Sequence, residues 1–462
     1  MQDIKLYNTL TKNTEVFKPI KEKEVGIYSC GPTVYHYQHL GNMRAVIFAD
    51  TLHRMFTYTG YKVNHVINIT DVGHNVDDAD NTEDKMEKGS RREGKSVWEI
   101  AKLYSDFYFK DLELLNVPLE NYTFPRATDH IREQIGLISA LEISGHTYTI
   151  SDGVYFDTST FPRYADFAHL DIEGLKSGAR VEENKEKRNI TDFALWKFSP
   201  KDEQRQMEWD SPWGVGFPGW HIECSAMSMK YLGEHFDIHT GGIEHIPVHH
   251  TNEIAQSECV TGQTYVNYWM HNNHLQDTTG KMSKSSGDFL TISTLIDKGY
   301  SPLLFRYFLM TAQYRKELSF SFENLDATAT AYNKLTSWCA SNVSTNGNVN
   351  EEYKNKFEGA ILNDLNTPQV LALIWDLIKD DLVSNEDKYV TILLFDEVLG
   401  LNLKEAKKEE VVIPDNVKEL LEARAGARLS SDWQESDRLR DEILSLGYIV
   451  KDGKEGQEIS KK

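Results

Sequence analysis

The sequence contains little cysteine: four cysteines among 462 residues are too few for a disulfide scaffold in a chain of this length. It has no uninterrupted apolar run long enough to cross a bilayer. Its first residues, Met-Gln-Asp-Ile-Lys-Leu-Tyr, lack the cationic and then apolar order of a secretory signal. We therefore expect a protein of the reducing cytoplasm that is neither disulfide-built nor membrane-spanning.

Positive charge is also scarce, because 50 lysines and arginines stand against 71 aspartates and glutamates, for a net charge of −21. Taken alone, this balance disfavours nucleic acid as a partner. It does not exclude it, since binding to phosphates depends on a local basic track and not on the global sum. The length exceeds what one hydrophobic core can organise, so roughly two to four domains are expected.

Residues 25–69 have the order strand, loop, helix, strand. A short apolar run ends at Cys30 and breaks at Gly31-Pro32; apolar residues then recur at helical spacing over 41–58, and a second strand-like run covers 61–69. This order is one half of a doubly wound nucleotide-binding unit, in which ligands bind beyond the carboxyl ends of the strands. The helix N-terminus offers free N–H groups and a positive dipole end to a phosphate.

The rest of the chain predicts how this unit is completed. A polar, acidic loop is expected over 77–94 and a helix over 96–115, and residues 126–199 mix an amphipathic helix (130–144) with strand-like pieces, which is typical of an insertion. Strand–helix alternation resumes over 209–289, and helical patterns follow to about residue 403. We expect an α/β fold, with a split Rossmann core that is interrupted by an insertion and followed by helical domains and a small tail.

Four residues have the chemistry of a metal site. Cys30 ends the first strand, Cys224 lies in Gly-Trp-His-Ile-Glu-Cys, and His249 and Glu253 are four apart, so on a helix both project from one face. Sulfur, imidazole and carboxylate are all good zinc ligands. From spacing alone, however, two buried cysteines, a core histidine and a surface glutamate are the favoured interpretation, because no Cys-x-x-Cys pair is present.

A second group lies in the segment Lys281-Met-Ser-Lys-Ser285, between Gly280 and Gly287. Two lysines three residues apart, with two hydroxyls, suit the charge that develops on a leaving pyrophosphate. In isolation a solvated basic loop would be the better interpretation. The helix start His39-Leu-Gly-Asn42 elsewhere in the same chain favours the phosphate role.

These motifs carry a family resemblance. His39 to Asn42 resembles the HIGH signature, and Lys281 to Ser285 the KMSKS signature, of class I aminoacyl-tRNA synthetases. Further blocks resemble the cysteinyl-tRNA synthetase family, and the likeness extends over nearly the whole chain. They are Cys30-Gly-Pro-Thr-Val-Tyr35, Asn68-Ile-Thr-Asp71, Trp209-Asp-Ser-Pro-Trp-Gly214, Gly219-Trp-His-Ile-Glu-Cys-Ser-Ala-Met227 and His249-His-Thr-Asn-Glu-Ile-Ala-Gln256.

The resemblance implies a cysteine–tRNA ligase, which forms cysteinyl-adenylate from L-cysteine and ATP and transfers the cysteinyl group to the 3′ end of tRNA(Cys). It favours a metal site over the interpretation without a metal. It implies that Zn²⁺ is held by Cys30, Cys224, His249 and Glu253, and that the substrate cysteine binds to this ion as a thiolate. A metal that prefers sulfur would reject serine, whose hydroxyl is a harder and far less acidic ligand.

The resemblance also implies roles for the other site residues. Thr70 and Trp220 would line the amino-acid pocket, while His39 and Asn42 would contact the ATP phosphates. The other nucleotide-binding residues would be Gly41, Gly241, Gly242 and Glu244. Lys281 and Lys284 would stabilise the leaving pyrophosphate. Mg²⁺ is expected with ATP, and the enzyme is expected to be a monomer.

The domains implied by the resemblance follow the patterns above. They are the first half of a Rossmann catalytic domain (1–125), a connective insertion (126–200), the second half of the core (201–290), a helical stem-contact domain (291–345), a helical domain (350–405) and an anticodon-binding tail (414–462). In the tail, Arg424 and Arg428 are one turn apart, so a helix could align them as a local basic edge, and Trp433 is available to stack on an unpaired base. The alternative is an ordinary salt-bridged helix with a packed Trp433, which is the favoured interpretation for either arginine alone.

Three other functions are compatible with part of these residues. A cysteine ligase acting on an amino sugar, of the mycothiol type, would share the core but leave the C-terminal third without a role. A zinc hydrolase built on His249, His250 and Glu253 would need an open water position on the metal and would leave the KMSKS segment unexplained. A non-catalytic tRNA-binding paralogue would have no use for the lysines and the metal ligands.

Overall fold

The computed structural model describes residues 2–73, 84–171, 184–200, 205–277, 280–281, 290–407, 414–453 and 456–461. The chain forms two compact units, the first made of residues 1–335 and 342–404 and the second of residues 336–341 and 405–462. Within these described residues no helix is long and apolar enough to cross a membrane.

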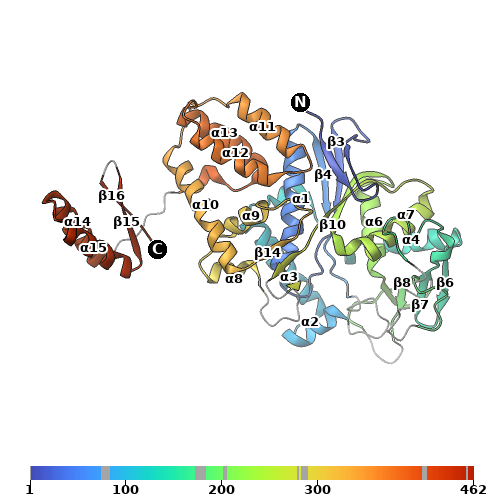
Figure 1. Cartoon of the computed structure of the whole chain (residues 1–462). Coiled ribbons are helices and arrows are strands. Elements are labelled where there is room, and N and C mark those ends of the chain that lie inside the picture. The colour runs from blue at the N-terminus through green and yellow to red at the C-terminus, as the bar shows by residue number, and fades with distance from the viewer. Residues whose placement is uncertain are drawn as a thin grey trace. The chain divides into compact units, whose positions relative to one another are not determined.

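A five-stranded parallel sheet forms the centre of the first unit (Figure 1). Its strands, in spatial order, are β11 (Val266–Asn272), β10 (Phe236–Gly242), β3 (Glu24–Ser29), β4 (Lys62–Ile67) and β5 (Tyr122–Thr123). All four neighbouring pairs are parallel. Because β3 and β10 are adjacent but far apart in sequence, the core is split, as the sequence predicted.

Helix α1 (Leu40–Tyr58) connects β3 to β4 and confirms the helix predicted over 41–58. Leu40, Met43 and Ile47 are buried at spacings of three and four residues, so they line one face of the helix. The helix ends at Thr59, and Gly60 follows with a φ of +78° that glycine adopts without strain. The N-terminus of α1 therefore lies immediately after the loop that leaves β3.

The insertion is built on a four-stranded antiparallel sheet of β6 (Thr147–Ile150), β7 (Gly153–Phe156), β8 (Phe193–Phe198) and β9 (Gly216–Pro218). Helix α4 (Ile131–Ile143) packs against it, and their shared core includes Leu141, Phe156 and Trp196. β9 carries the sheet past residue 200, where the sequence predicted that the second half of the core begins. After β9, α6 (Trp220–Leu232) leads back to β10, and α7 (Thr251–Thr261) connects β10 to β11.

The segment predicted as a loop over 77–94 is helical in its second part, so this prediction is wrong there. α2 (Lys85–Glu93) begins where the Asp84 side chain accepts from the N–H groups of Met86 and Glu87, and it ends at Gly94 with a left-handed φ of +64°. Its sequence has almost no apolar spacing, so the two caps were its only signals. Helix α3 (Val97–Leu114) agrees with the predicted helix, and Ser96 and Glu99 form its capping box.

Helices cover the other side of α1. The strands β12 (Leu275–Asp277) and β13 (Gly280–Lys281) form a small sheet with β14 (Leu318–Phe320), which comes later in the chain. The helices are α8 (Ile292–Asp297) and α9 (Pro302–Met310) before β14, and α10 (Phe322–Ser341), α11 (Glu351–Ile361), α12 (Thr367–Lys379) and α13 (Asn385–Leu399) after it. Residues 342–404 belong to the same compact unit as the core. The helices α11 to α13 are thus part of the unit that contains the parallel sheet.

A buried ion pair holds these helices to α1. Arg306 is completely buried, pairs with Asp50 at 2.5 Å, and donates to the carbonyl oxygens of Leu399 and Leu115. Burial alone would raise the pKa of Asp50, but the guanidinium groups of Arg306 and Arg54 outweigh it and lower that pKa to about 2. Asp50 is therefore charged at neutral pH, and the pair fixes α9 and α13 on α1.

The second unit contains the helices α14 (Asp415–Leu429) and α15 (Trp433–Ser445) and the hairpin of β15 (Tyr448–Gly453) and β16 (Gly456–Lys461). Its small core is formed by Val417, Ile443, Tyr448 and Val450. The tail from residue 414 therefore consists of two helices and a hairpin.

Candidate active site

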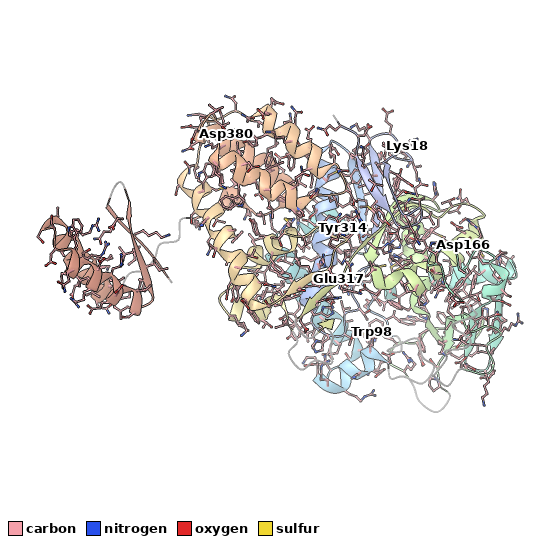
Figure 2. All side chains as sticks on the ribbon, in the orientation of Figure 1. Lys18, Trp98, Asp166, Tyr314, Glu317 and Asp380 are labelled. Atoms are coloured by element: carbon pink, nitrogen blue, oxygen red, sulfur yellow. The ribbon has the colours of Figure 1, made fainter. Side chains whose placement is uncertain are left out.

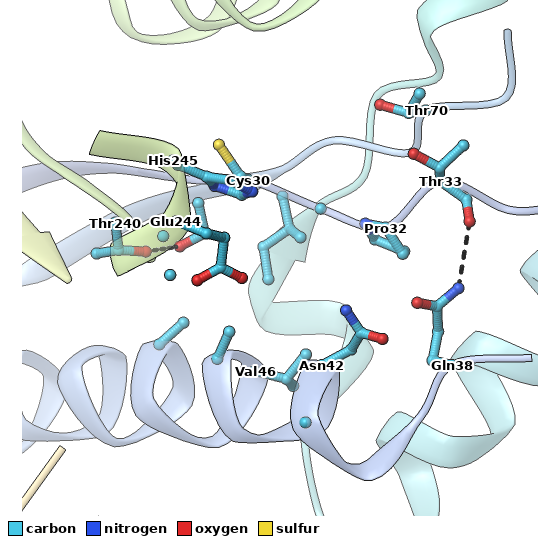
Figure 3. A pocket seen from close by; sticks show the side chains of 18 of the residues that line it. Cys30, Pro32, Thr33, Gln38, Asn42, Val46, Thr70, Thr240, Glu244 and His245 are labelled. Atoms are coloured by element: carbon cyan, nitrogen blue, oxygen red, sulfur yellow. Dashed lines mark hydrogen bonds between the residues drawn. The ribbon is translucent and has the colours of Figure 1, made fainter. Parts of the chain in front are cut away.

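A pocket of about 290 Å³ opens beyond the carboxyl ends of β3 and β10. Figure 3 shows it between α1 below and the loop from Cys30 to Thr33 above, with Asn42 and Glu244 pointing into it. Most of the predicted site residues line this pocket, namely Cys30, His39, Gly41, Asn42, Thr70, Trp220, Cys224, Gly241, Gly242, Glu244 and His249. The fold thus brings together residues from five separate sequence segments.

The first turn of α1 forms one wall. The His39 Nδ1 accepts from the Asn42 backbone N–H at 3.2 Å, and the Asn42 Oδ1 accepts from the His39 backbone N–H at 3.3 Å, so both side chains cap the helix. In a neutral His39 the proton is then on Nε2. Because Oδ1 of Asn42 is engaged, its amide nitrogen is the group directed at the pocket in Figure 3. The helix end presents donors, which suits an anion.

The opposite wall is the end of β10, where Gly241 and Gly242 leave little room. A Cβ at Gly241 would lie 2.8 Å from the His250 ring, and one at Gly242 would lie 2.3 Å from the Glu244 carboxylate. Glu244 Oε2 is also 3.5 Å from His274 Nδ1. These glycines let the backbone of β10 form this wall of the pocket, and the Glu244 side chain lies over it.

The metal-like residues lie at the closed end of the pocket. Ligand atoms of Cys30, Cys224, His249 and Glu253 all lie within 4.8 Å of one another. Cys30 follows β3 and Cys224 is on α6, while His249 is in the π-helical turn Ile246–His250 that leads into α7, which carries Glu253. His249 Nε2 is 3.1 Å from Glu253 Oε1, so the two residues four apart do face one another.

A second combination is equally close. Cys30 and Glu253 also lie within 4.8 Å of His239 and His250. His239 Nε2 is 2.9 Å from Glu253 Oε2, and His250 Nε2 is 3.3 Å from Cys30 Sγ. The cluster is therefore a dense group of sulfur, imidazole and carboxylate donors.

The electrostatics of the cluster favour a cation. Glu253 is completely buried, and its Oε1 accepts no hydrogen bond from any described group, although His249 is close. Burial raises the pKa of the Cys30 thiol well above its usual value, and the neighbouring Cys224 and Glu253 raise it further. Burial also lowers the pKa of His250 well below its usual value. A divalent cation would neutralise the buried carboxylate and let the thiols ionise, so the donor set fits a metal.

The amino-acid side of the pocket contains Thr70 and Trp220. The Thr70 hydroxyl donates to Glu223 Oε2 at 2.9 Å and accepts from the Asn68 amide at 3.0 Å. The Trp220 ring lies 4.4 Å from the His249 ring, and the Lys85 ammonium lies 5.7 Å from the Trp220 ring centre. Trp220 therefore borders the pocket beside the candidate metal ligand His249.

The two KMSKS lysines are described only in part. Lys281 is in β13, which is paired with β12 next to the pocket residues His274 and Leu275, but its side chain is not described. Lys284 lies outside the described residues. Their predicted role toward pyrophosphate remains a prediction.

Several site residues escaped the sequence reasoning. Asn68 is the most connected, because its Oδ1 accepts from the Gly31 N–H at 2.8 Å and lies 3.8 Å from Cys224 Sγ. His239 belongs to the second donor group, together with His250, which the sequence indicated only for the zinc-hydrolase alternative, and His221 Nδ1 is 2.9 Å from His249 Nδ1. Asn68, His221 and His250 all stand inside quoted motifs, but only the packing shows what they touch.

The basic edge predicted in the tail is wrong for Arg424. This residue is 1% exposed, and its guanidinium group donates to both carboxylate oxygens of Asp452, at 3.0 and 3.1 Å. Arg428 also pairs with Asp452, at 2.9 Å, and its guanidinium group is 5.5 Å from the Trp433 ring centre. Arg424 faces inward because it ties α14 to the hairpin. Trp433 itself is 58% exposed.

Comparison with known proteins first defines the class. Residues 16–330 match the family model described as tRNA synthetases class I (C) catalytic domain. A solved methionyl-tRNA synthetase from Mycobacterium tuberculosis, in complex with methionyl-adenylate, has the same fold, with a TM-score of 0.55 and 14% identity over 84% of this chain and 92% of that one. The fold is that of a class I aminoacyl-tRNA synthetase.

The relatives define the family within that class. The chain is 50% identical to Cysteine–tRNA ligase 1 of Burkholderia lata, over 98% of this chain and 96% of that protein, and 43% identical to the cysteine–tRNA ligase of Treponema denticola, over 97% and 98%. Residues 411–459 match the model of the cysteinyl-tRNA ligase anticodon binding domain. The chain belongs to the cysteine–tRNA ligase family.

Gly31 gives a test of how tightly the pocket is built. A Cβ there would lie 1.6 Å from the Asn68 carbonyl oxygen, which is backbone and cannot rotate away. Gly31→Ala should therefore lower the free energy of unfolding by about 1–3 kcal/mol, as measured by urea denaturation. Gly136 is the matched control, because it is exposed on α4 with nothing near its Cβ position. Gly136→Ala should raise stability by about 0.5–1 kcal/mol. Equal effects of the two substitutions would contradict the described contact.

Proposed function

We propose that this protein is a cysteine–tRNA ligase. It activates L-cysteine with ATP to cysteinyl-adenylate, with release of pyrophosphate, and transfers the cysteinyl group to the 3′ end of tRNA(Cys). The observation that carries the proposal is the meeting, in one pocket, of a donor-rich helix start at His39 and a buried sulfur, imidazole and carboxylate cluster around Glu253. The first suits a nucleotide phosphate and the second suits a thiol substrate.

Zn²⁺ is the metal that the donor set fits, with Cys30, Cys224, His249 and Glu253 as its ligands. When bound, it supplies a sulfur-preferring position at which a substrate thiol ionises and serine is a poor ligand. Trp220 and Thr70 border this position, so the amino-acid side chain would be enclosed between them. A site that demands one specific bond discriminates strongly without a separate editing step.

The activation step depends on positioning and on charge. The cysteine carboxylate attacks the α-phosphorus of ATP, the bond to the β-phosphate oxygen breaks, and pyrophosphate leaves. The N–H groups at the start of α1, the Asn42 amide and Lys281 and Lys284 supply positive potential to the phosphates, while Gly41, Gly241, Gly242 and Glu244 border the nucleotide. Mg²⁺ would accompany ATP. The tail from residue 414 would then contact the anticodon end of tRNA.

The first prediction concerns the reaction. The purified protein should catalyse ATP–pyrophosphate exchange that depends on L-cysteine, with a kcat/KM for L-serine lower by about 10⁴-fold. Adding tRNA(Cys) should yield charged tRNA, whereas an amino-sugar acceptor should yield no product. Exchange with no charging of tRNA would favour the amino-sugar ligase, and no exchange at all would contradict the proposed function.

The second prediction concerns the metal. Elemental analysis of the purified protein should find about one zinc ion per chain. Cys224→Ser should lose the metal and raise the KM for cysteine, because it removes a thiolate ligand. His239→Ala is the control: it should keep the zinc if His249 is the ligand, and should lose it if the second donor group holds the ion. An active, zinc-free wild-type protein would contradict selection through sulfur.

The third prediction concerns the tail. Trp433→Ala should weaken tRNA binding by about 1–3 kcal/mol, because an exposed ring that can stack on a base is removed. Cysteine-dependent exchange should not change. Leu429→Ala is the control, since Leu429 is 89% exposed on the neighbouring helix and offers no ring for stacking. Equal tRNA affinities of the Trp433 variant and the wild type would show that this side chain has no role in binding.

A further inference from the structure

Arg44 is a buried cation whose partners are backbone carbonyls. It is 3% exposed on α1, and its guanidinium group donates to the carbonyl oxygens of His274, Tyr314 and Lys316. Burial lowers the pKa of Arg44 to about 10, so the group stays protonated at neutral pH. Burying a charge is costly, and an apolar side chain would fill the same space at lower cost. The contacts with the three carbonyl oxygens are therefore what an apolar side chain at this position would not provide.

The carbonyls belong to two neighbouring segments. His274 immediately precedes β12, and Tyr314 and Lys316 precede β14, which pairs with β12 in parallel. The segments are also joined directly, because the Asn273 N–H donates to the Tyr314 carbonyl at 2.9 Å. Tyr314, which is labelled in Figure 2, stacks on Phe48 of α1 with ring centres 4.3 Å apart. Arg44 thus attaches the start of β12 to α1.

The same helix holds the other end of the KMSKS region. β12 continues into β13, which ends at Lys281, and the chain is next described at Leu290. The Leu290 carbonyl accepts from the Leu40 N–H at 2.9 Å. Leu40 and Arg44 are one turn apart at the beginning of α1, directly after the cap residue His39. Both ends of the chain that carries Lys281 and Lys284 are therefore bonded to the helix that begins at His39.

We propose that Arg44 is a positioning residue, which fixes β12, and through it the backbone of the strand β13 that ends at Lys281, relative to the first turns of α1. This inference rests on the proposed function, in which both elements act on the phosphates of ATP. Arginine suits the task, because its planar fork reaches three carbonyls at once and a lysine cannot. A displacement of about 1 Å in such a group can cost about 100-fold in rate.

The test is Arg44→Lys, which keeps the charge and loses the fork. The kcat of cysteine-dependent ATP–pyrophosphate exchange should fall about 10- to 100-fold, while the KM for cysteine should stay within about twofold. Arg306→Lys is the matched control, because Arg306 is also a buried arginine on two backbone carbonyls but does not touch β12 or Leu290. It should lower the melting temperature without a comparable fall in kcat. Equal falls in kcat, or an equal rise in the KM for cysteine, would overturn the inference.

A double-mutant cycle separates positioning from general stability. If Arg44 acts through the strand that carries Lys281, Arg44→Lys should have little further effect on kcat in the Lys281→Ala background, within about twofold. Effects that multiply would overturn the inference.

Hydrogen exchange gives a readout that does not need activity. Amides of 273–277 and 314–318 should exchange about 10-fold faster in Arg44→Lys than in the wild type or in Arg306→Lys. Unchanged exchange would overturn the inference even in an inactive protein, whereas a wild type without ATP–pyrophosphate exchange would overturn the proposed function instead.

Discussion

The parallel pairing of β3 with β10 is the contact on which the rest of the site depends. It joins Ile27, Tyr28 and Ser29 to Ile238, His239 and Thr240, and the Cys30 N–H continues it by donating to the Thr240 carbonyl at 3.2 Å. β3 connects onward to β4 on one side, and β10 to β11 on the other, so the pair is the point where the strand order turns. In doubly wound sheets the ligand crevice lies at this point. The insertion can be long because it leaves and returns without entering this pair.

The pairing also explains why two kinds of chemistry share one pocket. The loop after β3 contains Cys30 and leads to the start of α1 (Figure 3). Strand β10 ends with Gly241 and Gly242, and the segment after it contains the turn that carries His249. Anion-binding donors and metal-binding donors therefore lie on the two sides of one crevice. A substrate with a thiol at one end and a carboxylate at the other can reach both, provided that the nucleotide lies along α1. Cysteine meets this condition, and the buried Glu253, whose Oε1 accepts no hydrogen bond from a described group, lies where the proposed cation would be bound.

Much of this arrangement was predictable from the sequence, and the failures have physical reasons. Helix α1 was predicted because apolar residues recur at helical spacing over 41–58. The residue chemistry of Cys30, Cys224 and Glu253 suggested a metal site, but their spacing favoured ordinary buried residues, since the three are far apart in the chain, and only the resemblance favoured the metal. α2 was missed because its stability comes from Asp84 and Gly94 at its ends and not from an apolar face. Arg424 was predicted on the surface because charged side chains usually lie there. Its two hydrogen bonds to the Asp452 carboxylate depend on the hairpin of β15 and β16, which is distant from Arg424 in sequence.

The central claim is that the cluster at the end of β3 selects sulfur through a bound zinc ion, and X-ray absorption at the zinc edge tests it most directly. With Cys30 and Cys224 as ligands, the ion in the free protein should show two sulfur neighbours at about 2.3 Å. Saturating L-cysteine should raise this number to three, and saturating L-serine should leave it at two. A zinc ion whose sulfur count is the same with and without L-cysteine would contradict the claim.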